Sequence, residues 1–528
     1  MPAATPTRVF ALALLAWAAA AAGAAGAAAS PADDELARRT YANAEQLLRE
    51  GKIEQALKDF EQVSTAYPQS DMADDALYRM GSHYYPVEGF ETLGTAGREA
   101  IARAKEIFSR INSRYPREDH APRALYKLGL IALDPSNPQR SLDEAYASFS
   151  GVVNIYPGSD VVDRALFGAG YADFLAGRLD KAITSFEAAA ERFPRGTAAQ
   201  ESRYHMGLAH ARLGSAIRAL EEFQNVRDVD PNGRLARRAL DRLTQVHKLK
   251  VLPGLGVKPL FVLDERYAPA LDPNTVKGEV SLAVDQDNVL RLLDSRTGSI
   301  VRLARDGRLQ STGQPLPGAV SVAVDPAGVE LAAAGDRIRS GMELVIPSRQ
   351  EGSGARPYEK ITAVARVGTH EAALLDEGRN EILQYSGDPA RLKLLYRDPS
   401  GRARLSGLAA GAEGKLYSID RRGRKILEIP AGPAVQQGGA VREVPLPAEA
   451  DRLLQEPAAL AADDLGTLYV LDRRSRAVVV MTSDGRMLEA IEPKPGPSEM
   501  GYPAALAVGP GAEIYVYDAK RRTILRFR

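Results

Sequence analysis

The sequence predicts a two-domain protein of the α + β multidomain class, an N-terminal all-α solenoid of helical repeats followed by an all-β six-bladed propeller. Between residues 30 and 250, small and aromatic residues recur at fixed offsets, which is typical of stacked helix pairs. Between residues 258 and 528, hydrophobicity alternates with a period of two, and six similar units follow one another. The Pro/Gly-punctuated stretch 251–257 is the expected linker.

Residues 1–29 have the order of a secretory signal. Arg8 precedes the apolar run "VFALALLAWAAAAAGAAGAAA", and Ala27–Ala29 before Ser30 supply small residues for cleavage. The alternative is an uncleaved anchor, because the run reaches the roughly 20 residues that span a bilayer. Only its first half contains Phe, Leu and Trp, so we favour cleavage and a periplasmic or secreted protein that is not integral to the membrane.

Composition excludes several classes of site. Lysine plus arginine equals aspartate plus glutamate, 68 each, so no overall field favours nucleic acid. The chain has no cysteine, which excludes a disulfide framework, a thiol nucleophile, a thiolate metal site and a cysteine-linked lipid anchor. We expect no cofactor.

The helical half contains five copies of one pattern. Its clearest copy places Gly170, Ala182, Phe186 and Pro194 at relative positions 8, 20, 24 and 32. The other copies, two with a lengthened turn, are Ala44/Ala56/Phe60/Pro68, Gly81/Ala104/Phe108/Pro116, Gly129/Ala145/Phe149/Pro157 and Gly207/Ala219/Phe223/Pro231.

Each column has a physical reason. Small residues let two antiparallel helices approach closely, and the aromatic residue fills the gap to the next repeat. Proline ends the second helix because it cannot donate the interior hydrogen bond. These columns resemble the tetratricopeptide repeat, and residues 233–250 are then expected to form the solvated cap helix of the solenoid.

This resemblance implies a concave groove lined by the first helices. Tyr78, Tyr126, Phe167 and Tyr204 occupy equivalent positions there, and we expect most of them to be core between repeats. The joins "YPQSDMADDALYRMG", "YPREDHAPRALYKLG" and "YPGSDVVDRALFGAG" resemble two bacterial envelope families. One is the tetratricopeptide component of the outer-membrane β-barrel assembly machine, and the other is the periplasmic repeat protein associated with the Tol-Pal system.

The propeller units each run strand, turn, strand, and end in aspartate. They start near Ala283, Ala323, Ala365, Ala409, Ala461 and Ala507, a spacing that fits four-stranded blades. The unit "PAALAADDLGTLYVLDRRSRAVVVMTSDGRML" resembles the NHL repeat. The last unit ends after its third strand, so the strand "KPLFVLD" (258–264) is expected to complete that blade and remove the sheet edges.

The acidic residues of these units are interpreted as turn builders. Asp463 falls in the turn between first and second strands, where aspartate is favoured. The residue that leaves the second strand is aspartate in all six units: Asp294, Asp336, Asp376, Asp420, Asp472 and Asp518.

Basic residues follow that aspartate in the last three units. We predict a candidate rim for anions or partners, the arginine rim, that consists of Arg421, Arg422, Arg424, Lys425, Arg473, Arg474, Arg476, Lys520, Arg521 and Arg522. It would face an acidic protein, lipid headgroups or lipopolysaccharide phosphates. The alternative is a set of solvated turns whose charge nearby acids offset.

No reaction centre is predicted. The propeller has one histidine, His370, whereas zinc lyases of this architecture need several, and the helical-half histidines are interpreted as packed or solvated. We therefore expect a non-enzymatic envelope scaffold for protein partners, with no nucleic acid. The alternatives are a ligand- or metal-binding propeller with hydrolase or lactonase activity, and a protein that binds anionic lipid or lipopolysaccharide.

Overall fold

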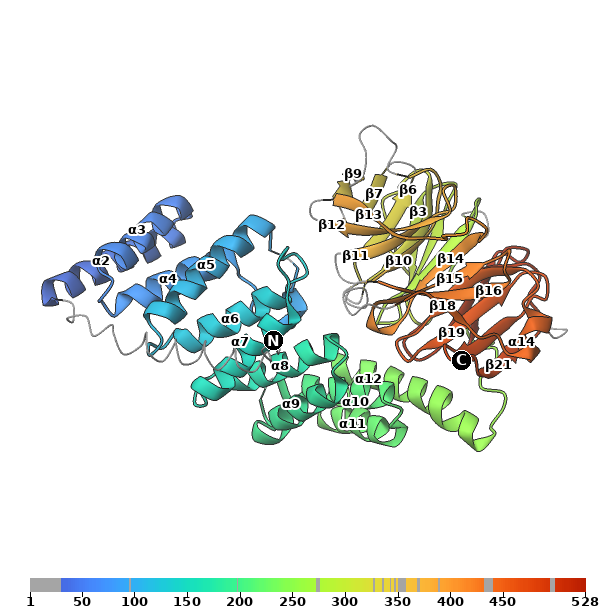
Figure 1. The fold of residues 1–528 in the computed structure, drawn as a ribbon, viewed down its shortest axis with the longest axis horizontal. Coiled ribbons are helices and arrows are strands. Elements are labelled where there is room, and N and C mark those ends of the chain that lie inside the picture. The colour runs from blue at the N-terminus through green and yellow to red at the C-terminus, as the bar shows by residue number, and fades with distance from the viewer. Residues whose placement is uncertain are drawn as a thin grey trace, which may run out of the picture. The chain divides into compact units, whose positions relative to one another are not determined.

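The computed structural model describes residues 30–528 except 95, 197, 272–275, 326–327, 335–336, 342, 346–347, 350–357, 368–370, 388–389, 432–439 and 494–498. The predicted fold class is confirmed, since an array of antiparallel helices precedes an all-β propeller of six sheets (Figure 1). The predicted signal at 1–29, His370 and Asp336 lie outside the described residues. Contacts group the chain into two compact units, Met1–Glu88 with Ala96–Ile131, and Gly89–Thr95 with Ala132–Arg528.

The first unit contains the leading helices of the array: α2 Pro31–Arg49, α3 Ile53–Ala66, α4 Met72–Tyr84, α5 Arg98–Arg114 and most of α6 Ala121–Leu133. Ser30 caps α2, because its hydroxyl accepts a hydrogen bond from the backbone N–H of Asp33 at 3.2 Å. A Cβ at Gly81 would lie 2.6 Å from the ring of Phe108, so only glycine lets these two helices approach so closely.

The second unit contains the remaining helices: η1 Phe90–Thr92, α7 Leu142–Ile155, α8 Val162–Leu175, α9 Leu179–Arg192, α10 Ala198–Arg212, α11 Ala216–Val229, α12 Arg234–Val246, a π-helical turn His247–Val251 and η3 Leu252–Leu255. The repeat columns explain the packing. A Cβ at Gly170 would lie 2.7 Å from Phe186, and a Cβ at Gly207 equally close to Phe223. The aromatic ring therefore covers the glycine of its own repeat as well as the gap to the next.

The six sheets of the propeller are antiparallel apart from one added parallel strand, β9. The first two blades consist of β1 Val280–Val284, β2 Leu290–Asp294, β3 Ser299–Leu303 and β4 Leu309–Thr312, and of β5 Ala319–Val324, β6 Glu330–Ala334, β7 Arg337–Ser340 and β8 Glu343–Val345. The next two consist of β10 Ile361–Arg366, β11 Glu371–Asp376, β12 Glu381–Gly387 and β13 Ala390–Arg397, with β9 Ser348–Arg349, and of β14 Leu405–Ala410, β15 Lys415–Asp420, β16 Lys425–Pro430 and β17 Arg442–Val444. The last two consist of β18 Pro457–Ala462, β19 Thr467–Asp472, β20 Val478–Thr482 and β21 Met487–Ile491, and of β22 Pro503–Val508, β23 Ile514–Asp518 and β24 Thr523–Phe527. Two short helices, η4 Ala412–Gly414 and α14 Ala448–Leu453, lie in the connections.

The predicted closure of the last blade is confirmed. The N–H of Val262 donates to the carbonyl of Arg528 at 3.0 Å, and the N–H of Asp264 donates to the carbonyl of Arg526 at 2.8 Å. Leu263 and Phe527 form the antiparallel bridge between these two segments. Both ends of the propeller therefore meet in one blade, which leaves no free edge on β24.

The expectation of a solvated cap helix at 233–250 is wrong in one respect. The helix forms, but Ala239, Val246 and Leu249 are fully buried. Arg242 of α12 donates to Asp464 at 2.8 Å, and Gln245 donates to Asp463 at 3.2 Å. Propeller turns thus cover one side of this helix, because it carries polar groups that match the acidic turn of β18 and β19.

Candidate functional site: the arginine rim of the propeller

The aspartate that ends each second strand organises the turn on which the rim is built. Asp472 accepts hydrogen bonds from the N–H groups of Arg474 at 2.9 Å and Ser475 at 2.8 Å, and from Glu456 at 2.5 Å. Its buried carboxylate thereby fixes both its own turn and the chain that enters the blade. The interpretation as turn builders is confirmed for the described members of the set: Asp294, Asp376, Asp420, Asp472 and Asp518.

The fourth residue after this aspartate has a left-handed backbone. The positions and their φ angles are Gly298 (70°), Asn380 (57°), Arg424 (51°), Arg476 (57°) and Arg522 (52°). Glycine and asparagine adopt this conformation readily, whereas for most other residues it costs about 1–2 kcal/mol. Arginine in the last three blades is therefore not what the turn itself favours, which suggests that its side chain has a role.

Several of the rim cations have acidic neighbours. The pairs and their N···O distances are Arg424–Asp451 (3.2 Å), Lys425–Glu443 (3.2 Å), Arg473–Glu456 (3.7 Å), Arg476–Glu499 (3.9 Å) and Arg521–Glu499 (3.9 Å). These pairs support the alternative of solvated, charge-balanced turns. They also connect successive blades, since Glu499 lies between Arg476 of one turn and Arg521 of the next.

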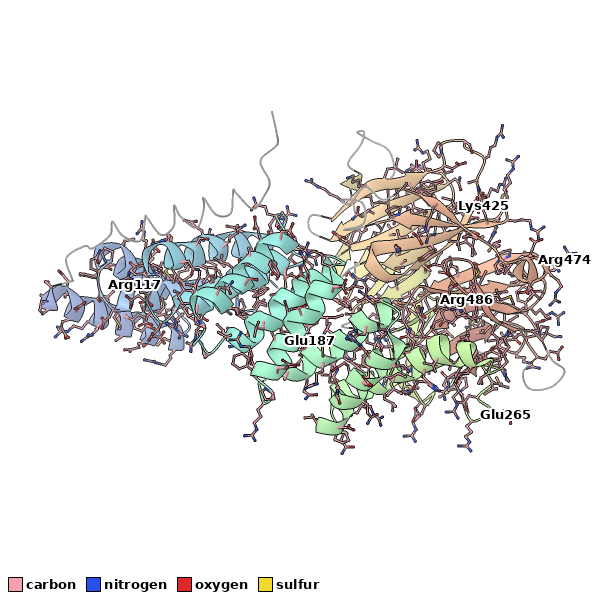
Figure 2. All side chains as sticks on the ribbon, turned by 60° about the horizontal axis from the view of Figure 1, so that its bottom comes forward. Arg117, Glu187, Glu265, Lys425, Arg474 and Arg486 are labelled. Carbon is pink, nitrogen blue, oxygen red and sulfur yellow. The ribbon has the colours of Figure 1, made fainter. Side chains whose placement is uncertain are left out.

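The other side chains leave an excess of positive charge on the rim. Arg421, Arg422, Arg474 and Lys520 are exposed, and within the described part of the chain no carboxylate lies within ion-pair distance of them. Figure 2 shows Arg474 projecting from the edge of the propeller, on the same side as Lys425. The structure therefore keeps at least four rim cations available to a ligand.

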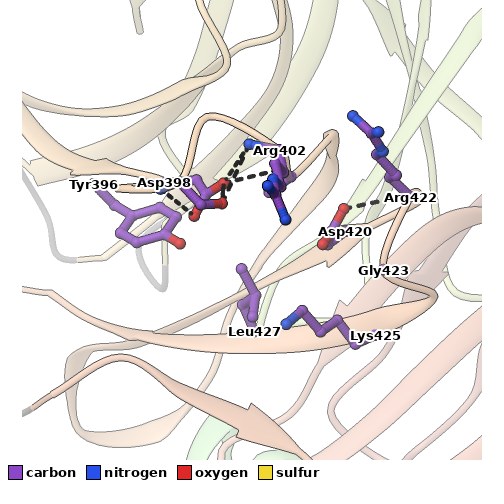
Figure 3. Close-up of a pocket in the computed structure, with 10 residues that line it drawn as sticks. Tyr396, Asp398, Arg402, Asp420, Arg422, Gly423, Lys425 and Leu427 are labelled. Atoms are coloured by element: carbon purple, nitrogen blue, oxygen red, sulfur yellow. Dashed lines mark hydrogen bonds between the residues drawn. The ribbon is translucent and has the colours of Figure 1, made fainter.

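A pocket of about 290 Å³ adjoins the first turn of the rim. It lies between the loop after β13 and the turn of β15 and β16, and its lining includes Tyr396, Arg402 and Lys425. In Figure 3, the hydroxyl of Tyr396, the guanidinium of Arg402 and the ammonium of Lys425 surround the hollow, with Leu427 between them, while Arg422 points away.

The two carboxylates that line this pocket are already satisfied. Asp398 accepts hydrogen bonds from the N–H groups of Arg402 and Ala403, both at 2.8 Å, and from the Ser400 hydroxyl at 2.6 Å. These donors, that of Ala403 first, lower the pKa of Asp398 to about 2. Asp420 likewise accepts from the N–H groups of Arg404 and Arg422. The cations of the pocket are therefore not neutralised by these acids.

Sequence reasoning missed Arg402 and Tyr396. Tyr396 lies near the end of β13, and Arg402 lies in the connection that follows, within "YRDPSGRARL", whose Asp-Pro-Ser-Gly stretch signals only a turn. The nearness of this loop to the rim depends on how adjacent blades pack, which the spacing of units along the chain does not contain.

The acidic pair Asp463 and Asp464 has two roles. Asp463 accepts from the N–H groups of Leu465 and Thr467, as expected for a turn residue. Burial, followed by repulsion from Asp464, raises the pKa of Asp463. Burial is the largest influence on Asp464 and acts to raise its pKa, but the charges of Arg242 and Arg212 and the hydrogen bond from Gln245 together outweigh it and lower that pKa. The pair thus serves both the turn and the contact with α12.

The rim and this contact lie at opposite ends of the same strand. Asp463 and Asp464 precede β19, and Arg473 and Arg474 follow it. β19 has 6 residues, so roughly 20 Å of strand separates the two ends. The helix α12 therefore leaves the rim uncovered.

Within the described ranges, no group of three or more His, Asp or Glu side chains could hold a metal ion. In the same part of the chain, no helix combines the length and apolar character that crossing a bilayer requires.

The groove aromatics and histidines pack as expected. Tyr126, Phe167 and Tyr204 are buried, which confirms the prediction that most of these aromatics are core. His205 is surrounded by aromatic rings, and desolvation lowers its pKa to about 4, so it is a packed, neutral histidine at pH 7.

Comparisons with known proteins agree with this architecture. Residues 164–195, which span most of α8 and all of α9, match the family model of the tetratricopeptide repeat. No curated protein matches the sequence. Among solved structures, YrrB, a tetratricopeptide-repeat protein described as having an unusual peptide-binding site, is 20% identical, with a TM-score of 0.29 over 38% of this chain and 90% of that chain.

Other solved structures resemble the propeller. A streptogramin B lyase is 14% identical, with a TM-score of 0.37 over 51% of this chain and 97% of that chain. A gluconolactonase from Xanthomonas campestris is also 14% identical, with a TM-score of 0.37 over 48% of this chain and 86% of that chain. At these identities the likeness is one of fold alone. The helical repeats and the propeller together have the architecture of a protein-interaction scaffold.

Proposed function

We propose that this protein is a non-enzymatic scaffold of the bacterial cell envelope whose arginine rim binds an acidic segment of a protein partner. The signal-like residues 1–29 and the resemblance of the repeat joins to envelope families support export to the periplasm or beyond. Within the scaffold, the helical repeats and the propeller offer separate binding surfaces.

One observation carries the proposal for the rim. Three arginines occupy left-handed positions that glycine or asparagine fill in other blades, beside four exposed cations without an acidic neighbour in the described residues. Turn stability alone would favour Gly or Asn at those positions. An anionic partner gives the side chains a reason to be there.

The pocket at the first turn favours carboxylates among the anions. Arg402 offers the planar fork that carboxylates bind through two hydrogen bonds, and Leu427 and Tyr396 suit the methylene stem of a glutamate. The nearby carboxylate of Asp398, whose pKa is lowered to about 2, would repel a doubly charged phosphate more strongly than a single carboxylate. An acidic protein segment therefore fits better than a lipid or lipopolysaccharide headgroup.

The test is in-cell cross-linking of the tagged full-length protein, with partners identified by mass spectrometry. The variant Arg421→Glu/Arg474→Glu/Lys520→Glu reverses three exposed rim charges, and the control Arg117→Glu/Arg195→Glu/Arg308→Glu reverses three exposed arginines elsewhere. We expect a defined envelope complex with wild type and control, and at least a tenfold loss with the rim variant. Equal recovery from all three proteins would reject the rim.

Two further measurements separate the alternatives. The first is binding to vesicles with 30% phosphatidylglycerol in the absence of a protein partner. If this binding depends on the rim and falls steeply with salt, it would favour the hypothesis that the protein binds anionic lipid. The second is the metal content of the purified protein together with its rate of lactone hydrolysis. Stoichiometric bound metal and a hydrolysis rate that rim reversal leaves unchanged would favour the hypothesis of a metal-binding propeller with hydrolase or lactonase activity.

A further inference from the structure

One exposed aromatic side chain lies on the arginine rim, where the fifth blade (β18–β21) meets the sixth (β22–β24). The residue directly before a first strand has an equivalent place in several blades, because its carbonyl accepts a hydrogen bond from the N–H that follows the turn aspartate. These residues, with their donors and distances, are Glu279 (Ser295, 2.9 Å), Lys360 (Glu377, 2.8 Å), Arg404 (Arg421, 2.9 Å), Glu456 (Arg473, 3.0 Å) and Tyr502 (Ala519, 2.9 Å). All except Tyr502 are charged and exposed, whereas Tyr502 is aromatic and 46% exposed. Where other blades present a charge, the sixth blade thus presents an apolar ring to solvent.

The guanidinium of Arg473 lies over the ring of Tyr502. Its central carbon is 5.3 Å from the ring centroid, within the range of cation–π contacts. The carboxylate with which Arg473 pairs, that of Glu456, is 3.7 Å from Nη1, which is too long for a hydrogen bond. The ring therefore helps to orient the guanidinium, and the long ion pair leaves its hydrogen bonds available.

Arg473 has hydrogen-bonding capacity that none of the described residues uses. Within this part of the chain its side chain makes no hydrogen bond, and its Nε is buried without a partner. The side chain as a whole is 35% exposed, so a ligand can reach the guanidinium only from its two Nη groups. The N–H groups at this end match the two oxygens of a carboxylate, as in bidentate arginine–carboxylate pairs. The stacked arginine is thus oriented to bind a carboxylate end-on.

Positive charge surrounds the exposed ring. The stem of Lys520 lies across Gly501, next to Tyr502, since a Cβ at Gly501 would be 2.9 Å from Cδ of Lys520. The buried acids of the two turns, Asp472 and Asp518, accept backbone N–H groups. The cations of these turns are Arg473, Arg474, Arg476, Lys520, Arg521 and Arg522, and the exposed acids that pair with them among the described residues are Glu456 and Glu499. Cations therefore outnumber acids around the ring, which attracts an incoming carboxylate.

We propose that Arg473 and Tyr502 form a recognition point of the arginine rim for an acidic residue that lies next to an aromatic residue in the partner segment. Arg473 takes the carboxylate through its Nη groups, and Lys520 adds a second positive charge. The aromatic side chain of the partner covers the exposed part of the Tyr502 ring. Tyrosine and arginine are among the residue types that most often carry the binding energy of an interface. The assignment rests on the proposed function, because this site is part of the rim.

The test uses fluorescence anisotropy of two fluorescein-labelled peptides, GSEEFEEGS and GSEESEEGS, with the full-length protein. The peptides have the same charge and differ only in the central residue. Wild type should bind the Phe peptide about fivefold more tightly than the Ser peptide. Tyr502→Ala should remove this preference, and Tyr502→Phe should keep it. If Tyr502→Ala loses the circular dichroism of the wild type, Tyr502→Leu takes its place, because it keeps an apolar side chain without the ring.

A second pair of variants tests the guanidinium. Arg473→Lys keeps the charge but loses the planar fork, so it should weaken binding of both peptides about tenfold. Arg474→Lys, the matched change at the next residue of the same turn, should bind both peptides within about twofold of wild type.

Three results would overturn this proposal and leave the rim in place, provided that Arg421→Glu/Arg474→Glu/Lys520→Glu still abolishes binding. They are equal affinity of wild type for the two peptides, an undiminished preference for the Phe peptide in Tyr502→Ala, and equal affinities of Arg473→Lys and Arg474→Lys. If neither peptide binds wild type, or if binding survives the rim reversal, the proposed function of the rim is rejected as well.

Discussion

The contact between α12 and the turn of β18 and β19 depends on one buried guanidinium. Arg242 donates to Asp464 at 2.8 Å and to Gln245 at 2.9 Å, with 10% of its side chain exposed, against 24% for Asp464. In Asp464→Asn, a cation would stay buried without its counter-ion. Breaking a buried pair in this way costs about 3–5 kcal/mol.

The expected readout is local opening of α12. A loss of about 3 kcal/mol corresponds to roughly a hundredfold faster amide exchange. Hydrogen–deuterium exchange with mass spectrometry of peptides from 234–251 and 463–469 measures it directly. Arg238→Met is the control, because Arg238 pairs at 3.0 Å with Asp287, whose side chain is 44% exposed, and such a pair contributes about 0–1 kcal/mol.

A double-mutant cycle decides whether the pair itself is responsible. Arg242→Met together with Asp464→Asn removes both members, so the double variant should be less destabilised than the sum of the single variants, by at least about 1 kcal/mol. Strict additivity, or unchanged exchange in α12 after Asp464→Asn, would refute the reasoning that this ion pair holds the helix.

Three further predictions concern stability, each measured by the thermal unfolding of the full-length protein. Arg476→Gly should stabilise by about 0.5–1 kcal/mol, because glycine relieves a left-handed backbone at φ 57°, whereas Arg474→Gly should not stabilise. Gly170→Ala should destabilise by about 1–3 kcal/mol, since its Cβ would meet Phe186 at 2.7 Å, and Gly158→Ala, with open space around it, should be neutral. Burial raises the pKa of Asp241 from 3.8 to about 6 despite the nearby Arg305. The contribution of Asp241 to the free energy of folding is therefore fully present below pH 3.8 and is lost as pH rises through 6. Asp241→Asn should flatten the dependence of stability on pH between pH 4 and 7, and an unchanged slope would contradict this.

Periodic features of this chain could be predicted from the sequence, and contacts between distant segments could not. The glycine and phenylalanine columns follow from helix packing within one repeat, and the aspartates that end second strands follow from turn chemistry within one blade. Arg242 and Asp464 are 222 residues apart, and neither stands out from its neighbours in charge or spacing. The packing of Phe90, whose ring centroid lies 4.8 Å from that of Phe167, could not be predicted for the same reason, since a lengthened turn does not say where its aromatic ring packs.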